Sequence, residues 1–347
     1  MIQLAIAGLQ GSRVQKQAAQ RGDIAVIAAS LDRFPRISLG TFPSPLTQAT
    51  LENGSRFWIK DDGGCSEIYG GNKVRKLEFL LAAAQHTRRN GLVVHGDVES
   101  HTVQACGLLG RKLGLAVQAV VFPCRGQSFE APELARLNKV GVRIHRRRSM
   151  LTTVLSAHWI GWRTSAWVVP LGASTPLASL GHVRAALELL DQFRERQLPE
   201  PRRIYLPFAT GGSVAGLLIG LALAGAKTRV VAVQTVEIVI ANRRRLGRLV
   251  KSTLALLGLG AKDVARCLRQ LELIDSRYLG RRYRDVPMGT ETALAAAAKQ
   301  GLCLESAFSG KAFAAMLDAL PAFPSDELLF WNTHDRRNGT TSVGGVR

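Results

Sequence analysis

The sequence predicts an α/β protein, and three observations carry this prediction. From Arg56 onward, short runs rich in β-branched residues alternate with longer segments of helical period, the pattern of a parallel sheet covered by helices. The chain has 347 residues and 46% hydrophobic content, enough for two lobes with separate cores. A glycine-rich turn joins one expected strand to an apolar helical stretch, which is where an α/β sheet binds anions.

The individual elements follow from the hydrophobic pattern. Two segments place their apolar side chains on one helical face, residues 74–84 and residues 103–113. The polar, proline-containing stretch 194–203 indicates a passage between lobes. The expected strands are residues 57–60, 92–95, 116–122, 142–145, 166–169, 204–208, 230–234 and 328–331.

Composition excludes several classes of protein. No apolar run approaches the roughly 20 residues that cross a bilayer. Residues 1–30 lack a basic start and a long apolar core, so we interpret them as an N-terminal extension of a cytoplasmic protein and not as a signal peptide. Five widely spaced cysteines without a C-x-x-C pair indicate reduced thiols and predict neither a disulfide framework nor a metal site.

The formal net charge of +20 is the unusual bulk property. Such a charge occurs in nucleic-acid-binding proteins and in proteins that attract anionic substrates. The basic residues here form short clusters such as 146–148 and 243–245, without interleaved aromatic residues. A solvated, arginine-rich surface is the better interpretation, and nucleic-acid binding is the weakest of the functional hypotheses.

The first candidate site is Gly70-Gly71-Asn72-Lys73 at the start of an expected helix. Two glycines permit a close backbone approach, and the positive end of the helix dipole disfavours the ammonium form of Lys73. A neutral, nucleophilic amine is what a Schiff-base lysine requires. The alternative is a Gly-Gly turn followed by a solvated Lys-Arg-Lys face.

The second candidate site is Thr210-Gly211-Gly212-Ser213, between strand and helix. It supplies backbone N–H groups, two hydroxyls and a helix N-terminus, which together suit a phosphate. The segment lacks the P-loop lysine and the full G-x-G-x-x-G pattern, so a small phosphorylated cofactor fits better than a nucleotide. The alternative is an ordinary glycine-rich turn with Ser213 as N-cap.

The third candidate site lies between Gly96 and Thr102, after another expected strand. Ser100 and Thr102 are able to hydrogen-bond a substrate carboxylate, and His101 is able to contact a cofactor oxygen or carry a proton. The alternative is a plain helix start, with serine as cap and acidic residues that favour the dipole.

Taken together, these segments resemble one family, the 1-aminocyclopropane-1-carboxylate deaminases and D-cysteine desulfhydrases. These are fold-type II, tryptophan-synthase-β-like enzymes that depend on pyridoxal phosphate (PLP). The resemblance runs from Leu31 to about Trp331, and its most specific part is the nine-residue signature Gly-Gly-Asn-Lys-x-Arg-Lys-Leu-Glu from Gly70 to Glu78. Further similar segments are 33–36, 42–46, 60–62, 169–174, 180–183, 210–213 and Phe308-Ser309-Gly310-Lys311.

The resemblance implies a fold, a cofactor and roles for particular residues. It implies a large PLP-binding domain of residues 31–77 and 186–347, a small α/β domain of residues 78–185, and PLP in the cleft between them. It also implies a homodimer that acts on a small amino acid. The implied catalytic residues are Lys73, Ser100 and Tyr283, and the implied cofactor contacts are Lys73, Asn72, His101, Thr210, Gly211, Gly212, Ser213 and Ser309.

Four departures from the family pattern concern the substrate pocket. Phe308 replaces a tyrosine, Asp97 replaces a glycine, one residue is missing after Ser100, and residues 331–337 replace a Thr-Gly-Gly loop. Two hypotheses follow. The first is a PLP-dependent lyase or deaminase, most similar to D-cysteine desulfhydrase, that gives a 2-oxo acid and ammonia by β-elimination. The second is a PLP-binding protein whose catalysis the altered loop impairs.

Overall fold

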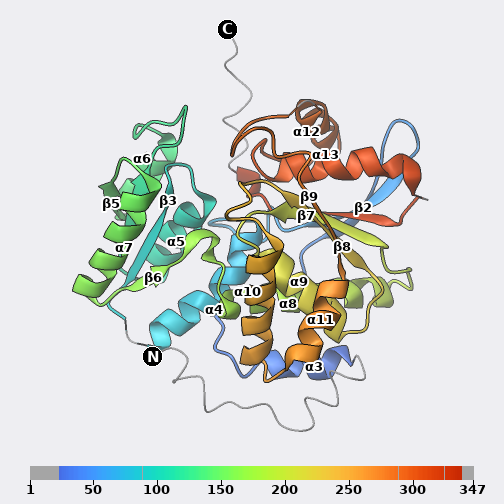
Figure 1. Ribbon diagram of the computed structural model, residues 1–347, viewed down its shortest axis with the longest axis horizontal. Coiled ribbons are helices and arrows are strands. Elements are labelled where there is room, and N and C mark those ends of the chain that lie inside the picture. Colours follow the sequence, from blue (N-terminus) through green and yellow to red (C-terminus); the bar gives the residue numbers. More distant parts are fainter. Residues whose placement is uncertain (1–22, 88, 288, 324, 338–347) are drawn as a thin grey trace.

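The structure is a computed structural model that describes residues 23–87, 89–287, 289–323 and 325–337. Strands and helices alternate along the chain, as Figure 1 shows, so the predicted α/β class is confirmed. The helices are α3 (Ile24–Leu31), α4 (Asn72–His86), α5 (His101–Lys112), α6 (Pro132–Lys139), α7 (Met150–Thr164), α8 (Pro176–Glu195), α9 (Gly212–Leu223), α10 (Arg243–Leu256), α11 (Ala261–Arg269), α12 (Thr290–Lys299) and α13 (Ser309–Ala319), with short 3-10 turns η1 (Leu171–Ala173) and η2 (Leu320–Ala322).

Within the described residues the strands form two sheets. The larger, six-stranded sheet has the order β1-β2-β10-β7-β8-β9, and the smaller, four-stranded sheet has the order β5-β4-β3-β6. The strands are β1 (Leu46–Thr50), β2 (Arg56–Asp61), β3 (Leu92–Asp97), β4 (Val117–Phe122), β5 (Arg143–Arg146), β6 (Trp167–Val169), β7 (Arg203–Phe208), β8 (Arg229–Gln234), β9 (Leu271–Asp275) and β10 (Leu328–Asn332).

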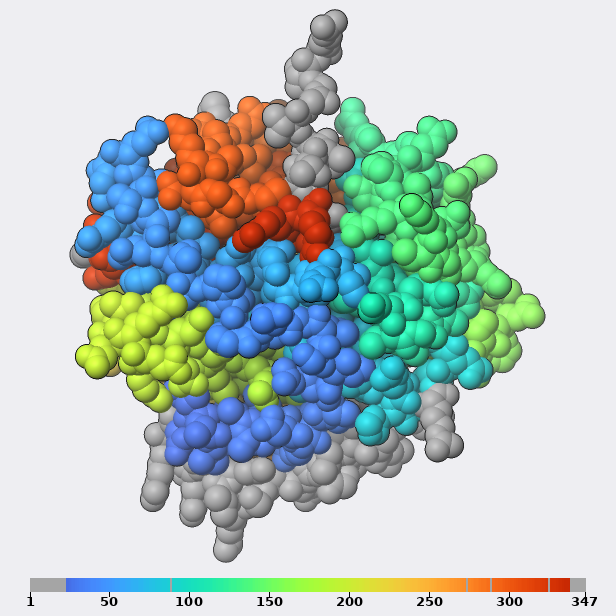
Figure 2. Space-filling model, turned by 180° about the vertical axis from the view of Figure 1, so that it is seen from behind, coloured from blue at the N-terminus to red at the C-terminus, as the bar shows by residue number. Residues whose placement is uncertain are grey.

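The larger sheet joins the two ends of the described chain. Strand β10 lies between β2 and β7 and runs parallel to both, while β1 pairs with β2 in the antiparallel sense. Figure 2 shows the consequence from behind, where the red C-terminal residues lie against blue N-terminal ones. Helices α8, α9 and α10 pack on one face of this sheet and α12 and α13 on the other.

Every strand that the sequence predicts is present, and two further strands were missed. Both missed strands, β1 and β9, are the edges of the larger sheet. In β1 only Leu46 and Ala49 are buried. An edge strand of this kind carries too few apolar residues for the hydrophobic pattern to reveal it.

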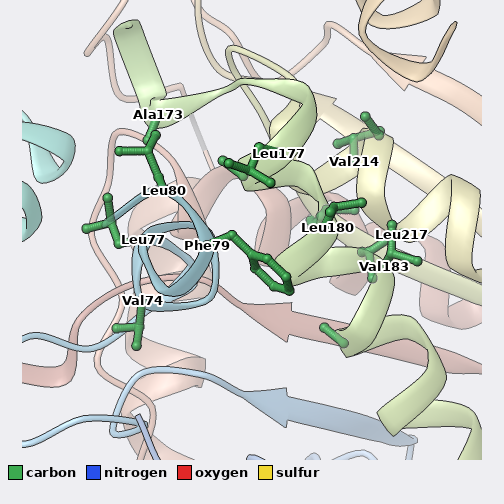
Figure 3. Packing of buried hydrophobic residues seen from close by; sticks show 14 of the residues in the cluster. Val74, Leu77, Phe79, Leu80, Ala173, Leu177, Leu180, Val183, Val214 and Leu217 are labelled. Atoms are coloured by element: carbon green, nitrogen blue, oxygen red, sulfur yellow. The ribbon is translucent and has the colours of Figure 1, made fainter. Parts of the chain in front are cut away.

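Helix α4 is held in place by a dense apolar core. Val74, Leu77 and Leu80 are fully buried, and Figure 3 shows α4 side chains packed beside residues of α8 and α9. Gly181 of α8 permits the close approach of the two helices, because a Cβ there would lie 2.0 Å from the backbone oxygen of Arg75. The first turn of α4 therefore has a fixed position relative to the larger sheet.

The division into domains stays a prediction. The smaller sheet and helices α5 to α7 form the lobe on the left of Figure 1. The expected boundaries after residues 77 and 185 fall inside α4 and α8, and α8 packs on α9 and α4 of the larger lobe. Of the expected N-terminal extension, residues 1–22 lie outside the described residues, whereas Ile24, Ile27 and Leu31 of α3 join the main core.

Three predictions from composition concern membrane spans, cysteines and the basic clusters. No helix among the described residues is long and apolar enough to cross a membrane. All five cysteines are free thiols. The arginines of the 243–245 cluster are exposed, as expected for a solvated basic surface.

Candidate active site

Lys73 is the second residue of α4 and lies in a cavity of about 540 Å³. The helix begins after Gly71, whose φ of 78° favours glycine and whose added Cβ would lie 2.4 Å from the backbone oxygen of Thr333. The Lys73 amine donates a hydrogen bond of 2.9 Å to Oδ1 of Asn72. Burial lowers the pKa of Lys73 to about 8, so a substantial fraction of its amine is neutral near physiological pH.

The residues that follow Lys73 are buried, which overturns the alternative of a solvated Lys-Arg-Lys face. Arg75 and Lys76 are only 2% and 3% exposed. The Arg75 guanidinium donates to both carboxylate oxygens of Asp62, at 2.9 and 2.8 Å, and also to Glu188. The indole of Trp331 donates to the same Asp62 carboxylate at 2.9 Å. These contacts fix the start of α4 against β10 and α8.

Residues of the turn between β7 and α9 and the Lys76 amine all lie against the Ser174 hydroxyl. The backbone N–H of Gly212 donates to the Ser174 hydroxyl at 3.1 Å, and that hydroxyl lies 2.7 Å from Oγ1 of Thr210. The Lys76 amine reaches the same Ser174 hydroxyl at 3.3 Å and the backbone oxygen of Gly172 at 3.1 Å. Gly212 leaves the space open, because an added Cβ would lie 2.9 Å from the Lys76 amine.

This cradle has the properties of a phosphate site. Burial lowers the pKa of Lys76 well below its ordinary value, and no carboxylate of the described residues pairs with it. A buried amine beside the N-terminus of α9 regains its proton most easily when an anion binds next to it, which suits a phosphate. Asn72 links the cradle to Lys73, since its amide also donates to the Ser213 hydroxyl at 3.0 Å. The sequence interpretation found Thr210 to Ser213 but missed Lys76 and Ser174.

Ser100 is the N-cap residue of α5 and lines the same cavity. Its hydroxyl makes no capping hydrogen bond, so it is free to contact a ligand. Next to it, Nδ1 of His101 lies 2.7 Å from the hydroxyl of the buried Tyr69. Burial, together with His334 and Lys73, lowers the pKa of His101 well below its usual value, which keeps the imidazole neutral at pH 7.

Tyr283 lines the cavity from the loop between β9 and α12. Its hydroxyl donates to Asp97 at 3.2 Å, and burial, with Asp97 second, raises its pKa well above the ordinary value. The neighbouring Arg284 binds Asp97 at 3.0 Å and Glu99 at 2.5 Å. The loop that carries Tyr283 is therefore tied to the end of β3 in the smaller lobe.

Ser309 lies behind the cavity wall. Its side chain is fully buried, and its hydroxyl donates to Oε1 of Glu305 at 3.0 Å. Glu305 and Phe308 line the cavity in its place, and Glu305 also accepts the backbone N–H groups of Phe308 and Ser309 at 2.7 Å. Glu305 thus caps the start of α13, a role that the sequence pattern did not reveal.

The loop after β10 contributes a side chain that sequence reasoning also missed. His334 is 3% exposed, neither ring nitrogen has a partner among the described residues, and its ring lies 5.1 Å from that of His101. Burial lowers the pKa of His334. His101, Glu305 and His334 each offer one atom able to bind a metal ion, and these atoms lie within 4.8 Å of one another. The sequence had predicted no metal site, because that prediction considered only the cysteines.

The cavity therefore assembles most of the predicted site from both lobes. Eight further predicted residues line it together with Lys73, and Ser309 does not. The eight are Asn72, Ser100, His101, Thr210, Gly211, Gly212, Ser213 and Tyr283.

A partly neutral lysine beside a phosphate cradle, in a cavity that residues of both lobes line, defines an enzyme that attaches a small phosphorylated aldehyde cofactor. The sequence signature of the family described as "Pyridoxal-phosphate dependent enzyme" matches residues 37–333. The chain belongs to this family, and its cofactor is PLP. Lys73 suits covalent attachment of the cofactor, and Lys76, Ser174 and the 210–213 turn suit its phosphate.

Several curated relatives are similar to the chain. Nocardicin C-9′ epimerase from Nocardia uniformis subsp. tsuyamanensis is 35% identical over 58% of this chain, and the similarity spans 64% of that protein, less than two thirds of its length. A D-cysteine desulfhydrase from Serratia proteamaculans is 29% identical over 84% of this chain and 89% of its own. A 1-aminocyclopropane-1-carboxylate deaminase from Burkholderia cenocepacia is 27% identical over 83% and 90%.

A solved structure described as an "ACC deaminase homologue" has the same fold. It superimposes with a TM-score of 0.77 at 24% identity and covers 90% of this chain and 95% of its own. This similarity supports the two-sheet architecture of the fold-type II enzymes.

Proposed function

We propose that the chain is a PLP-dependent lyase or deaminase that acts on a small amino acid, most like a D-cysteine desulfhydrase. The observation that carries this proposal is the placement of the Lys73 amine and the free Ser100 hydroxyl in one cavity with the phosphate cradle. The names of the curated relatives support the same class of reaction.

Each residue contributes a defined step in this proposal. PLP supplies an electron-withdrawing ring that stabilises the electron pair left at the substrate α-carbon. The Lys73 amine, with its pKa of about 8, accepts and returns the proton at that carbon. Ser100 and the N-terminus of α5 bind the substrate carboxylate. Tyr283 keeps its proton at neutral pH and is therefore able to act as an acid.

The proposed reaction is β-elimination followed by loss of ammonia, which gives a 2-oxo acid. PLP binding without turnover is the less favoured hypothesis, because Lys73, Lys76, Ser100 and the 210–213 turn line the same cavity. Epimerisation at the α-carbon is a second candidate, favoured by the 35% identity to nocardicin C-9′ epimerase.

The proposed setting of the enzyme is a cytoplasmic homodimer. The family resemblance supports the dimer, and the five free thiols support a reducing compartment such as the cytoplasm. Sedimentation of the purified protein would test the dimer.

Two measurements test the activity. The purified enzyme should absorb at about 410–420 nm through lysine-bound PLP, and Lys73→Ala should lose this band. D- and L-cysteine and their β-substituted analogues should then release pyruvate and ammonia. Deuterium incorporation at the α-carbon in D₂O without pyruvate would favour the epimerase, and a band with neither outcome would leave only a binding protein.

A further inference from the structure

The outer part of the cavity has an apolar wall to which both lobes contribute. Met150, the first residue of α7, and Val239, in the turn after β8, both line the cavity. They are 47% and 74% exposed, whereas Val236, which also lines the cavity, is only 7% exposed. The apolar lining residues of the cavity therefore include both buried and exposed side chains.

Single exposed apolar side chains are common on protein surfaces, but these two line one cavity. Large aliphatic residues at a cavity mouth are typical of ligand-binding surfaces. The nearby Ile238 is also 69% exposed but does not line the cavity. The functions assigned above to Lys73, Ser100 and the phosphate cradle leave Met150 and Val239 without a role.

Near Tyr283, carboxylates outnumber cations. Arg284 of the larger lobe binds Asp97 and Glu99 of the smaller lobe. Gln127 also donates to Asp97, at 3.0 Å, and Glu237 accepts the backbone N–H of Tyr283. This excess of negative charge disfavours an anionic ligand group, and an uncharged, apolar group matches the aliphatic side chains of Met150 and Val239.

We propose that Met150 and Val239 form a subsite for an extended apolar substituent on the amino-acid substrate. This inference rests on the proposed function and narrows its substrate to β-substituted amino acids such as S-alkyl or S-aryl cysteines. The cavity of about 540 Å³ lies within the range that holds drug-sized ligands. Cysteine alone would not cover the exposed wall.

The reaction on such a substrate balances without any further reactant than water. The bond between the β-carbon and sulfur breaks, the sulfur leaves with its electron pair, and it takes up a proton as the thiol RSH. The remaining three-carbon unit takes up one water molecule and gives pyruvate and ammonium. The sum is RS–CH₂–CH(NH₃⁺)–COO⁻ + H₂O → RSH + CH₃–CO–COO⁻ + NH₄⁺.

The test is a titration of the holoenzyme with S-methyl, S-propyl, S-butyl and S-hexyl cysteine, as D- and L-forms. Binding is followed by the change in cofactor absorbance and turnover separately by pyruvate. The dissociation constant should fall about threefold to fourfold per added methylene, the value for burial of apolar surface. Val239→Asp and Met150→Asp should flatten this dependence on chain length.

Ile238→Asp is the matched control, because it adds the same charge one residue away from Val239 and outside the cavity lining. It should keep the full dependence on chain length. Absence of binding, a dissociation constant independent of chain length, or equal flattening by the 238 and 239 variants would overturn the subsite. Chain-length-dependent binding without pyruvate would contradict the proposed function and leave the subsite standing.

Discussion

Lys76→Met should have opposite effects on the protein with and without its cofactor. In the cofactor-free protein, Lys76 is a buried amine whose pKa is held well below its ordinary value by burial. Because the unfolded chain binds more protons than the folded one, this lysine destabilises the fold below the unfolded pKa of about 10.4, and stability rises with pH. Removal of the amine should therefore stabilise the cofactor-free protein.

In the presence of PLP, the same substitution should remove the proposed hydrogen bond between the Lys76 ammonium and the cofactor phosphate. Hydrogen bonds to charged groups contribute about 1.5–3 kcal/mol, which corresponds to a loss of about 10- to 150-fold in PLP affinity. The 3% exposure of Lys76 places this bond at the strong end, because solvent screens it little.

The assay is a titration of cofactor-free protein with PLP, followed by the lysine-bound absorbance, together with thermal melts with and without PLP. Lys251, which is exposed on α10, provides the control. Lys251→Met should change neither the PLP affinity nor the melting temperature. If Lys76→Met lowered the melting temperature of the cofactor-free protein and left PLP affinity unchanged, the assignment of the phosphate cradle would be wrong.

Three further predictions concern the first turn of α4 and its supports. Gly71→Ala should lower the free energy of unfolding by at least about 1–3 kcal/mol in chemical denaturation, because the added Cβ meets the backbone oxygen of Thr333. It should also lower PLP occupancy, measured by absorbance. Gly54→Ala is the control, since Gly54 has a similar φ of 81° and nothing within 4 Å of an added Cβ. Asp62→Asn should cost about 3–5 kcal/mol at pH 7 because it leaves the buried Arg75 partly unpaired. Burial alone would raise the pKa of Asp62, but the charge of Arg75 outweighs burial and lowers it. The difference in free energy of unfolding between wild type and Asp62→Asn should therefore shrink as the pH falls below about 3.9 and through the folded pKa. A difference that stays constant in acid would contradict this account. The rate at which PLP attaches should rise through a pKa of about 8 as Lys73 loses its proton, and stopped-flow absorbance that showed no such rise between pH 6 and 9 would argue against it.

The sequence predicted the central strands of the sheets better than the edge strands of the larger sheet. Strands buried on both faces, such as β3 and β7, appear as continuous apolar runs. The missed strands β1 and β9 pair with only one neighbour each, so their sequences carry the weaker pattern of partial burial.

The candidate site was accessible from sequence only where local motifs define it. The start of α4 and the turn at 210–213 are contiguous segments with a recognisable chemistry. Lys76 was read as part of a helix face, because only the fold shows that Ser174, nearly 100 residues later, lies against its amine. His334 follows the last strand and meets His101 through the topology alone.

Ser309 illustrates the limit of reasoning by position within a motif. The family resemblance places residue 309 at the cofactor ring, whereas this hydroxyl donates to Glu305 and does not line the cavity. The contact of Ser309 with the ring nitrogen therefore stays a prediction.

The position of β10 in the larger sheet also determines when the enzyme can assemble. Strands β2 and β7 have no direct pairing in the sheet until β10, the last described strand, fills the place between them. The smaller lobe, by contrast, takes all its strands from a continuous stretch between Leu92 and Val169. During synthesis on the ribosome, the strands of the smaller lobe are complete long before those of the larger one, and we expect cofactor loading to wait until β10 has been made.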